Sequence, residues 1–124
     1  MAIPSTAKAV PGTFDPVDWR PVRIGVKNLL DIDGNERIDA ATFDQIMSPE
    51  GAALGVQIDD TGARAPEVIE AGTAVRLYLS VLEEFQNHLA FDAGVRVPIK
   101  LRFQTTADPF NRFERTIVVT FVNR

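Results

Sequence analysis

The chain contains no cysteine, and it has only one histidine, one tyrosine and one tryptophan among its 124 residues. The lack of cysteine excludes disulfides, thiolate zinc sites and cysteine nucleophiles together, and it is typical of a protein made in a reducing cytoplasm. No stretch approaches the ~18 consecutive apolar residues of a membrane span. The N-terminus has no charged segment followed by an apolar one, so we expect neither a secretory signal nor a membrane partner.

The same scarcity argues against catalysis. A serine–histidine–acid triad would need His88, the sole histidine, and no G-x-S-x-G nucleophile motif is present. Neither a G-x-G-x-x-G nor a Walker-type loop occurs, so the sequence does not support a phosphate cradle. Because acidic residues are numerous, paired-carboxylate chemistry stays open as a third hypothesis. The sequence predicts a protein that is not an enzyme, with no catalytic residue and no cofactor.

Length and composition fit one ordinary globular domain, with 45% apolar and 24% charged residues. The charge is uneven, because residues 31–70 carry ten acids and two bases, whereas residues 92–124 carry six bases and three acids. Either these charges mix on the folded surface, or an acidic face and a basic face meet across a contact between subunits. Nucleic acid is not expected as a partner, because the net charge of −4 opposes phosphate.

Residues 1–21 form a proline-rich segment that contains Pro4, Pro11, Pro16 and Pro21. Each proline removes a backbone donor and favours extended geometry in the residue before it. We therefore expect an extended arm rather than a helix or a central strand. The apolar side chains spaced along this arm are the predicted partner-binding residues, and they are Ile3, Val10, Phe14 and Trp19. The expected partners are copies of the chain itself or other subunits of an assembly.

The predicted fold is mainly β: a sandwich or partly closed sheet of about six strands, with one or two short helices and the extended N-terminal arm. Residues 22–124 form its single β-rich domain. Apolar and polar residues alternate with a period of two, the pattern of a half-buried strand, in 22–26, 56–58 and 95–103. Residues 116–122 are β-branched and aromatic, which also predicts a strand.

Three further segments carry specific expectations. Residues 39–47 are predicted as a helix with Asp39 as its N-cap, and residues 49–55 as a turn or short helical piece. Residues 74–91 fit both a strand and a helical stripe, and we favour a strand to about Leu82 with a helical continuation. Pro98 lacks a backbone donor, which favours an edge strand or a bulge at its position.

The acidic segment from Asp31 to Phe43 resembles the calcium loop of the EF-hand family, which reads D-x-D-x-(D/N)-G-x-I-x-x-x-E. Asp31, Asp33 and Asn35 match loop positions one, three and five, and Ile38 matches position eight. The resemblance implies a calcium-binding interaction module, and its ligands would be Asp31, Asp33, Asn35 and Asp39. Calcium is the only cofactor that any interpretation of the sequence implies.

The same segment departs from the EF-hand pattern at two positions. Glu36 stands where the family uses glycine for a sharp bend, and Thr42 where it uses a bidentate glutamate. The residues before the loop alternate as a strand and not as an entering helix. The competing interpretation is a β-hairpin, in which a strand ending near Ile32 turns through residues 33–35 and returns over 36–38.

In general architecture, a β-rich body with a proline-rich arm and no catalytic motif resembles small structural proteins of tailed bacteriophages. Head decoration (cement) proteins and tail or connector subunits are examples. The resemblance implies a non-catalytic protein that is made in the cytoplasm, resides in the virion and binds neighbouring subunits. Deletion of residues 1–20 is then expected to abolish assembly and to leave a folded domain.

Overall fold

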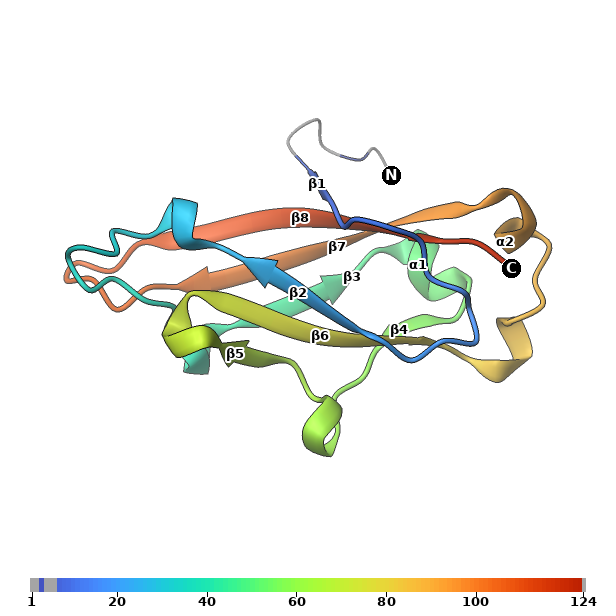
Figure 1. Ribbon diagram of the computed structural model, residues 1–124, viewed down its shortest axis with the longest axis horizontal. Helices are drawn as coiled ribbons and strands as arrows, with labels where there is room; N and C mark the ends of the chain where they lie inside the picture. The colour runs from blue at the N-terminus through green and yellow to red at the C-terminus, as the bar shows by residue number, and fades with distance from the viewer. Residues whose placement is uncertain (1–2, 4–6, 124) are drawn as a thin grey trace.

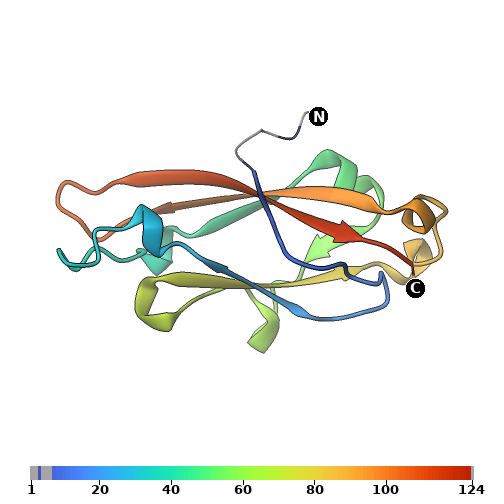
Figure 2. The same cartoon turned by 45° about the horizontal axis from the view of Figure 1, so that its top comes forward.

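Two β-sheets pack face to face along the molecule (Figures 1 and 2). The computed structural model describes residue 3 and residues 7–123. In order across the first sheet, the strands are β1 (Lys8–Ala9), β8 (Arg112–Phe121), β7 (Val95–Gln104) and β3 (Asp44–Met47). The second sheet consists of β2 (Pro21–Gly25), β6 (Ala74–Val81) and β4 (Val56–Ile58), with β5 (Glu67–Ile69) also paired to β6. The predicted mainly β sandwich is confirmed.

Strands β7 and β8 form a long antiparallel hairpin that runs along the longest axis of the molecule (Figure 1). The period of two read from the sequence divides the side chains of β7 between the two faces of its sheet. Val97, Ile99, Leu101 and Phe103 are buried between the sheets, whereas Lys100 is exposed on the other face. Strand β6 supplies the opposite wall of the core with its own alternate residues. The alternation predicted β7, and for β6 the strand was the favoured of two interpretations.

Short helical pieces connect the strands. The α-helices are α1 (Pro49–Ala53) and α2 (Ala90–Ala93), and the 3₁₀ turns are η1 (Lys27–Leu29), η2 (Ala40–Thr42), η3 (Gly62–Arg64), η4 (Glu70–Gly72) and η5 (Glu83–Phe85). Helix α1 begins where the sequence predicts a short helical piece, with Ser48 accepting from the Gly51 N–H at 3.2 Å. Residues 74–91 form a strand to Val81 followed by η5, as favoured.

The predicted helix over 39–47 is wrong. Asp39 does cap a turn, because its side chain accepts from the Ala41 N–H at 3.2 Å, but that turn is the single 3₁₀ piece η2. Residues 44–47 then form strand β3, paired in antiparallel register with residues 99–102 of β7. The pairing with β7 therefore overrides the helical spacing of the apolar residues, and Ile46 is left 41% exposed.

The predicted hairpin over 22–38 is also wrong, although its turn exists. The Asn35 N–H donates to the Ile32 carbonyl at 3.0 Å, and Asn35 adopts a positive φ of 62°. The Glu36 N–H donates to the Asp31 carbonyl at 2.9 Å, but the flanking segments form no strand pair beyond this bond, because β2 pairs with β6 and Ile38 bridges to Thr105. The segment between β2 and η2 is thus a connection that crosses from one sheet to the other.

Pro98 lies in β7, which is a central strand rather than the edge strand that proline favours. The Pro98 carbonyl accepts from the Ser48 N–H at 3.3 Å, on the side of β7 that faces β3. In an antiparallel strand the N–H and C=O of one residue point to the same side. An N–H at Pro98 would therefore point toward the β3 side and away from β8, so its absence removes no hydrogen bond between β7 and β8. On the β3 side, β3 ends at Met47, opposite Ile99, and Pro98 lies just beyond that ladder.

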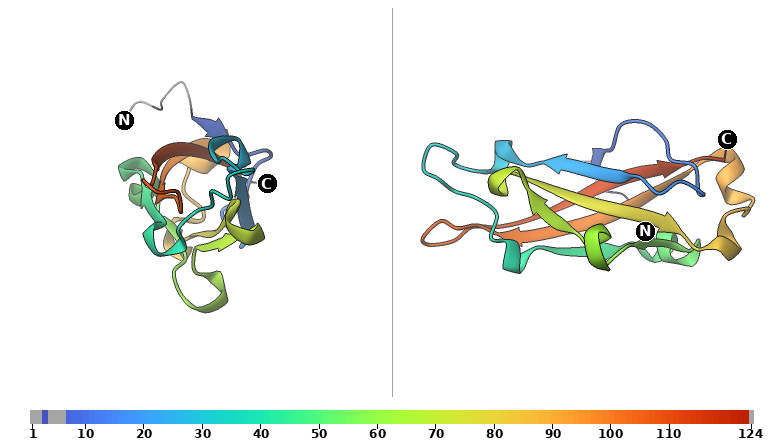
Figure 3. Two further views of the ribbon diagram at one scale, coloured as in Figure 1. Left: turned by 90° about the vertical axis from the view of Figure 1, so that its left-hand side faces the viewer. Right: turned by 60° about the horizontal axis from the view of Figure 1, so that its bottom comes forward.

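The described part of the N-terminal arm lies on the chain's own domain. The Val10 N–H donates to the Val118 carbonyl and the Phe14 N–H to the Thr120 carbonyl, both at 2.9 Å, so the arm extends the first sheet in parallel beside β8. The chain then turns near the C-terminal end of β8 and returns as β2 in the second sheet (Figures 1 and 3).

Candidate interaction surface

The four apolar residues predicted to bind a partner occupy different environments. Phe14 is only 6% exposed and packs on Phe121, with ring centroids 5.9 Å apart. Val10 is half-buried against the core, and Ile3 is also half-buried. Trp19, in contrast, is 63% exposed. Phe14 and Val10 therefore fix the arm to its own domain, and Trp19 is the residue of this set whose ring is largely open to solvent.

Trp19 is held by a cation that comes from a distant part of the sequence. The Arg64 guanidinium lies 4.7 Å from the centroid of the Trp19 ring and 4.6 Å from that of Tyr78. Arg64 ends η3, whereas Tyr78 lies on β6, where it pairs with Pro21 of β2. Cation–π contacts of this kind orient an aromatic ring even where it remains solvent-exposed. We call Trp19, Arg64 and Tyr78 the Trp19 surface.

A carboxylate fixes the guanidinium in turn. Asp59 Oδ2 accepts from Arg64 Nη2 at 2.6 Å and from Nε at 3.0 Å. Asp59 Oδ1 accepts from the Ser80 hydroxyl at 2.7 Å, and the Ser80 hydroxyl accepts from Gln57 Nε2 at 3.1 Å. These groups line a polar hollow of about 350 Å³ beside Trp19. The Trp19 surface thus combines a pre-oriented aromatic ring with an open hydrogen-bonding groove.

The residue types of this surface are those that carry binding energy between proteins. Tryptophan, tyrosine and arginine are enriched among interface hot spots. Tryptophan and tyrosine bury a large area with only two side-chain torsions, and the more flexible Arg64 is held here by Asp59. A side chain that is already held in place loses less entropy on binding. Sequence reasoning singled out Trp19 but missed Arg64, Asp59 and Tyr78, since no spacing in the sequence links them to residue 19.

The acidic segment is held in place by the carboxylate of Glu36. Glu36 points inward and is 5% exposed, and its carboxylate accepts from the Thr105 hydroxyl at 2.6 Å, the Asn111 side-chain amide at 2.7 Å and the Asp31 N–H at 2.9 Å. These three bonds hold the pKa of Glu36 below its usual value, the Thr105 bond being the largest cause. They tie residues 31–36 to the tip of the β7–β8 hairpin.

The proposed calcium ligands do not converge. Asp31 Oδ1 accepts from the Gly34 N–H at 3.1 Å, and the Asp39 side chain caps η2. Within residue 3 and residues 7–123, no three acidic or histidine side chains are grouped so as to hold a metal ion. The hypothetical set of Asp31, Asp33, Asn35 and Asp39 is therefore not brought together.

Calcium is expected to leave the protein unchanged. Addition of millimolar calcium should shift the melting temperature by less than about 1 °C, because a ligand stabilises a fold only in proportion to its binding. Differential scanning calorimetry with calcium, and with magnesium as control, measures this. A rise that is specific to calcium would restore the EF-hand interpretation of the acidic segment.

The two charge blocks meet within the chain. Asp44 from the acidic block pairs with Arg102 from the basic block across β3 and β7, and this bond lowers the pKa of Asp44 and raises that of Arg102. Within the basic block, Lys100 pairs with Glu114 at 3.2 Å across β7 and β8. These contacts show acids and bases mixing on the outer face of the first sheet.

No known protein family, curated protein or solved structure matches this chain. Among the described residues, no helix has both the length and the apolar character that a membrane crossing requires. The fold defines the class as a two-sheet β-sandwich whose N-terminal arm is part of one sheet. The Trp19 surface is its candidate functional site.

Proposed function

We propose that this chain is a non-catalytic assembly protein that binds neighbouring subunits, first of all copies of itself, through the Trp19 surface. A capsid decoration (cement) or tail protein of a virion is the setting that this role fits best. The mainly β body supports a rigid structural role, and so do the hydrogen bonds that join Val10 and Phe14 of the arm to β8.

The exposure of Trp19 carries the proposal. A tryptophan side chain buries more than ~150 Å² when it is covered, and leaving it 63% exposed forfeits much of that gain in an isolated chain. The ring is nevertheless fixed by Arg64, which Asp59 holds through two hydrogen bonds. An ordered, uncovered aromatic ring next to a polar groove is the arrangement of an interface anchor.

Fluorescence of Trp19 tests the proposal, because this residue is the sole tryptophan. As the protein concentration rises from about 1 µM to about 1 mM, a range that spans weak protein contacts, the emission should move to shorter wavelength and acrylamide quenching should fall. A Phe110→Ala variant is the matched control, because Phe110 is similarly exposed, at 57%, but lies in the β7–β8 loop. Emission that keeps its exposed wavelength over the whole range contradicts self-association through Trp19.

A further inference from the structure

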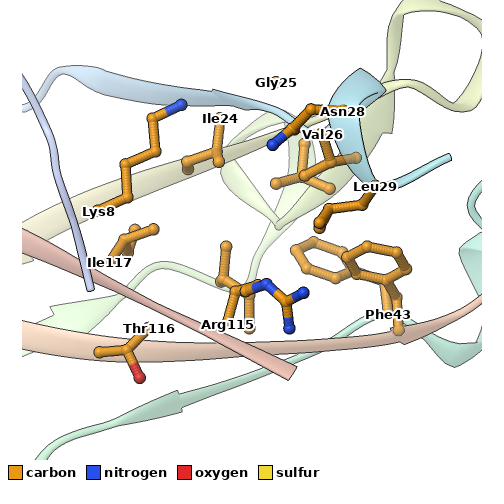
Figure 4. Close-up of a pocket in the computed structure, with 13 residues that line it drawn as sticks. Lys8, Ile24, Gly25, Val26, Asn28, Leu29, Phe43, Arg115, Thr116 and Ile117 are labelled. Atoms are coloured by element: carbon orange, nitrogen blue, oxygen red, sulfur yellow. The ribbon is translucent and has the colours of Figure 1, made fainter. Parts of the chain in front are cut away.

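A second hollow lies between the two sheets, and it shares no residue with the groove beside Trp19. It is a cavity of about 170 Å³ that opens between β2 and the middle of β8 (Figure 4). Its walls are apolar and belong to the core, and include Ile24, Val26, Leu101, Phe103 and Ile117. The interior of the cavity therefore suits a hydrocarbon group and not a hydrogen-bonding one.

The cavity stays open because the edge of the sandwich is incomplete there. Strand β1 is two residues long and pairs only with Ile117 and Val118 of β8. Next to it, Arg115 and Thr116 line the mouth of the cavity, and Asn28 and Leu29 of η1 lie on the other side. A gap in a core leaves its wall atoms without contacts on one side, so an apolar guest of the right size restores dispersion energy.

The rim of the cavity carries positive charge. Lys8 and Arg115 both line it, and no acidic residue does. Within the described chain neither cation has an ion pair, although Arg115 Nη1 donates to the Glu114 carbonyl at 2.9 Å. In Figure 4 the Lys8 amine and the Asn28 amide point toward one another across the mouth. The rim thus offers donors to an anion, whereas the interior offers only hydrocarbon.

We propose that this cavity binds a small organic acid, with its apolar body between the sheets and its carboxylate at Lys8 and Arg115. An apolar cavity of about 150 Å³ can hold a benzene-sized guest, so a body of about six carbons matches the 170 Å³ found here. Both cations are exposed, so the carboxylate keeps part of its hydration, and its binding avoids the large desolvation penalty of a buried charge. The site is independent of the Trp19 surface and of its role in assembly.

Titration of ¹⁵N-labelled protein with hexanoate, and separately with 1-hexanol, tests the proposal by amide chemical shifts. Both probes should shift the signals of Val26, Leu29 and Ile117, with a dissociation constant for hexanoate of roughly a millimolar or below. Hexanoate should bind about fivefold more tightly than 1-hexanol, the gain expected of exposed ion pairs. If neither probe shifts these signals at ten millimolar, no ligand site exists.

Two variants separate the parts of the site. The double variant Lys8→Met with Arg115→Met keeps the cavity apolar and should bind both probes equally, losing the fivefold preference. Asn28→Trp places a bulky ring on an exposed rim position and should abolish binding of both probes while leaving the fold intact. A preference for hexanoate that survives the double variant overturns the role of the two cations, and binding that survives Asn28→Trp places the ligand elsewhere.

Discussion

Phe14→Ala should lower the free energy of unfolding by about 3–5 kcal/mol, the range measured for large-to-small changes at buried phenylalanines. Phe14 is 6% exposed and lies between Phe121, at 5.9 Å between ring centroids, and the Arg20 guanidinium, 4.4 Å from its own ring centroid. Removal of the ring leaves a cavity at the junction of the arm with β8. Urea denaturation followed by far-UV circular dichroism measures the change.

Trp19→Ala is the matched control for this experiment. It removes a larger ring from the same arm, but from an exposed position, and should change the free energy of unfolding by less than about 1 kcal/mol. A cost below about 1 kcal/mol for Phe14→Ala would mean that the arm is a separable attachment. Deletion of residues 1–20 would then leave a stable domain, as the sequence alone predicts, whereas the structure predicts severe destabilisation because β1 and Phe14 are lost.

Glu36→Gln should lower the melting temperature at pH 7 by about 4 °C or more, the shift that a modest loss of stability produces in a domain of this size. The Glu36 carboxylate accepts three hydrogen bonds, from Asp31, Thr105 and Asn111. An amide presents one oxygen and one NH₂ group, so at least one of these donors would face another donor. A buried donor without an acceptor is strongly destabilising.

The pH dependence of this effect has a definite sign. Because the pKa of Glu36 is lowered in the folded state, the carboxylate contributes stability above its unfolded pKa, near 4.5, and this contribution is lost as the pH falls through the folded pKa. The melting temperatures of the wild type and Glu36→Gln should therefore converge as the pH falls below 4.5 and through the lowered pKa of Glu36 in the folded state. Glu84→Gln, at an exposed position, is the control and should match the wild type. A constant difference between Glu36→Gln and the wild type from pH 7 to pH 3 would show that the carboxylate charge contributes nothing.

The strands that could be predicted are those whose pattern spans many residues. Residues 95–103 alternate over most of β7, which buries Val97, Ile99, Leu101 and Phe103. Residues 116–122 are β-branched and aromatic rather than alternating, and β8 buries Ile117, Val118 and Val119 in succession. The segment 39–47 is too short for the spacing of its apolar residues to distinguish a helix from a strand. Its apolar residues fit a helix, but pairing with residues 99–102 makes it a strand, and that partner lies more than fifty residues away.

Turns proved easier to predict than the partners of the strands that flank them. Residues 32–35 do turn, because asparagine tolerates the positive φ found at Asn35. The sequence favoured a hairpin since the nearest strand is the default partner. It could not show that Glu36 is drawn inward by Thr105 and Asn111, which the distant β7–β8 tip supplies.

The candidate site was predictable only in its most unusual residue. The sole tryptophan in an arm drew attention to Trp19. Arg64 of η3 reaches it by lying over Tyr78 of β6, the strand that pairs with β2 just after Trp19. Phe14 and Trp19 have the same apolar character in the sequence. Their opposite exposures, 6% and 63%, arise because Phe14 bridges to Phe121 of β8, whereas Trp19 follows the turn from Asp15 to Asp18 and lies just before β2. A proline-rich sequence has no period that reveals this difference.

Sedimentation velocity of the wild type, Trp19→Ala and Phe110→Ala over the same concentration range tests the assembly role of the Trp19 surface most directly. The wild type and Phe110→Ala should gain mass as concentration rises. Trp19→Ala should associate at least about 30-fold more weakly, the loss expected on truncation of an interface hot spot. Equal association constants for Trp19→Ala and the wild type, or a wild type that stays monomeric at 1 mM, would contradict the role proposed for this surface.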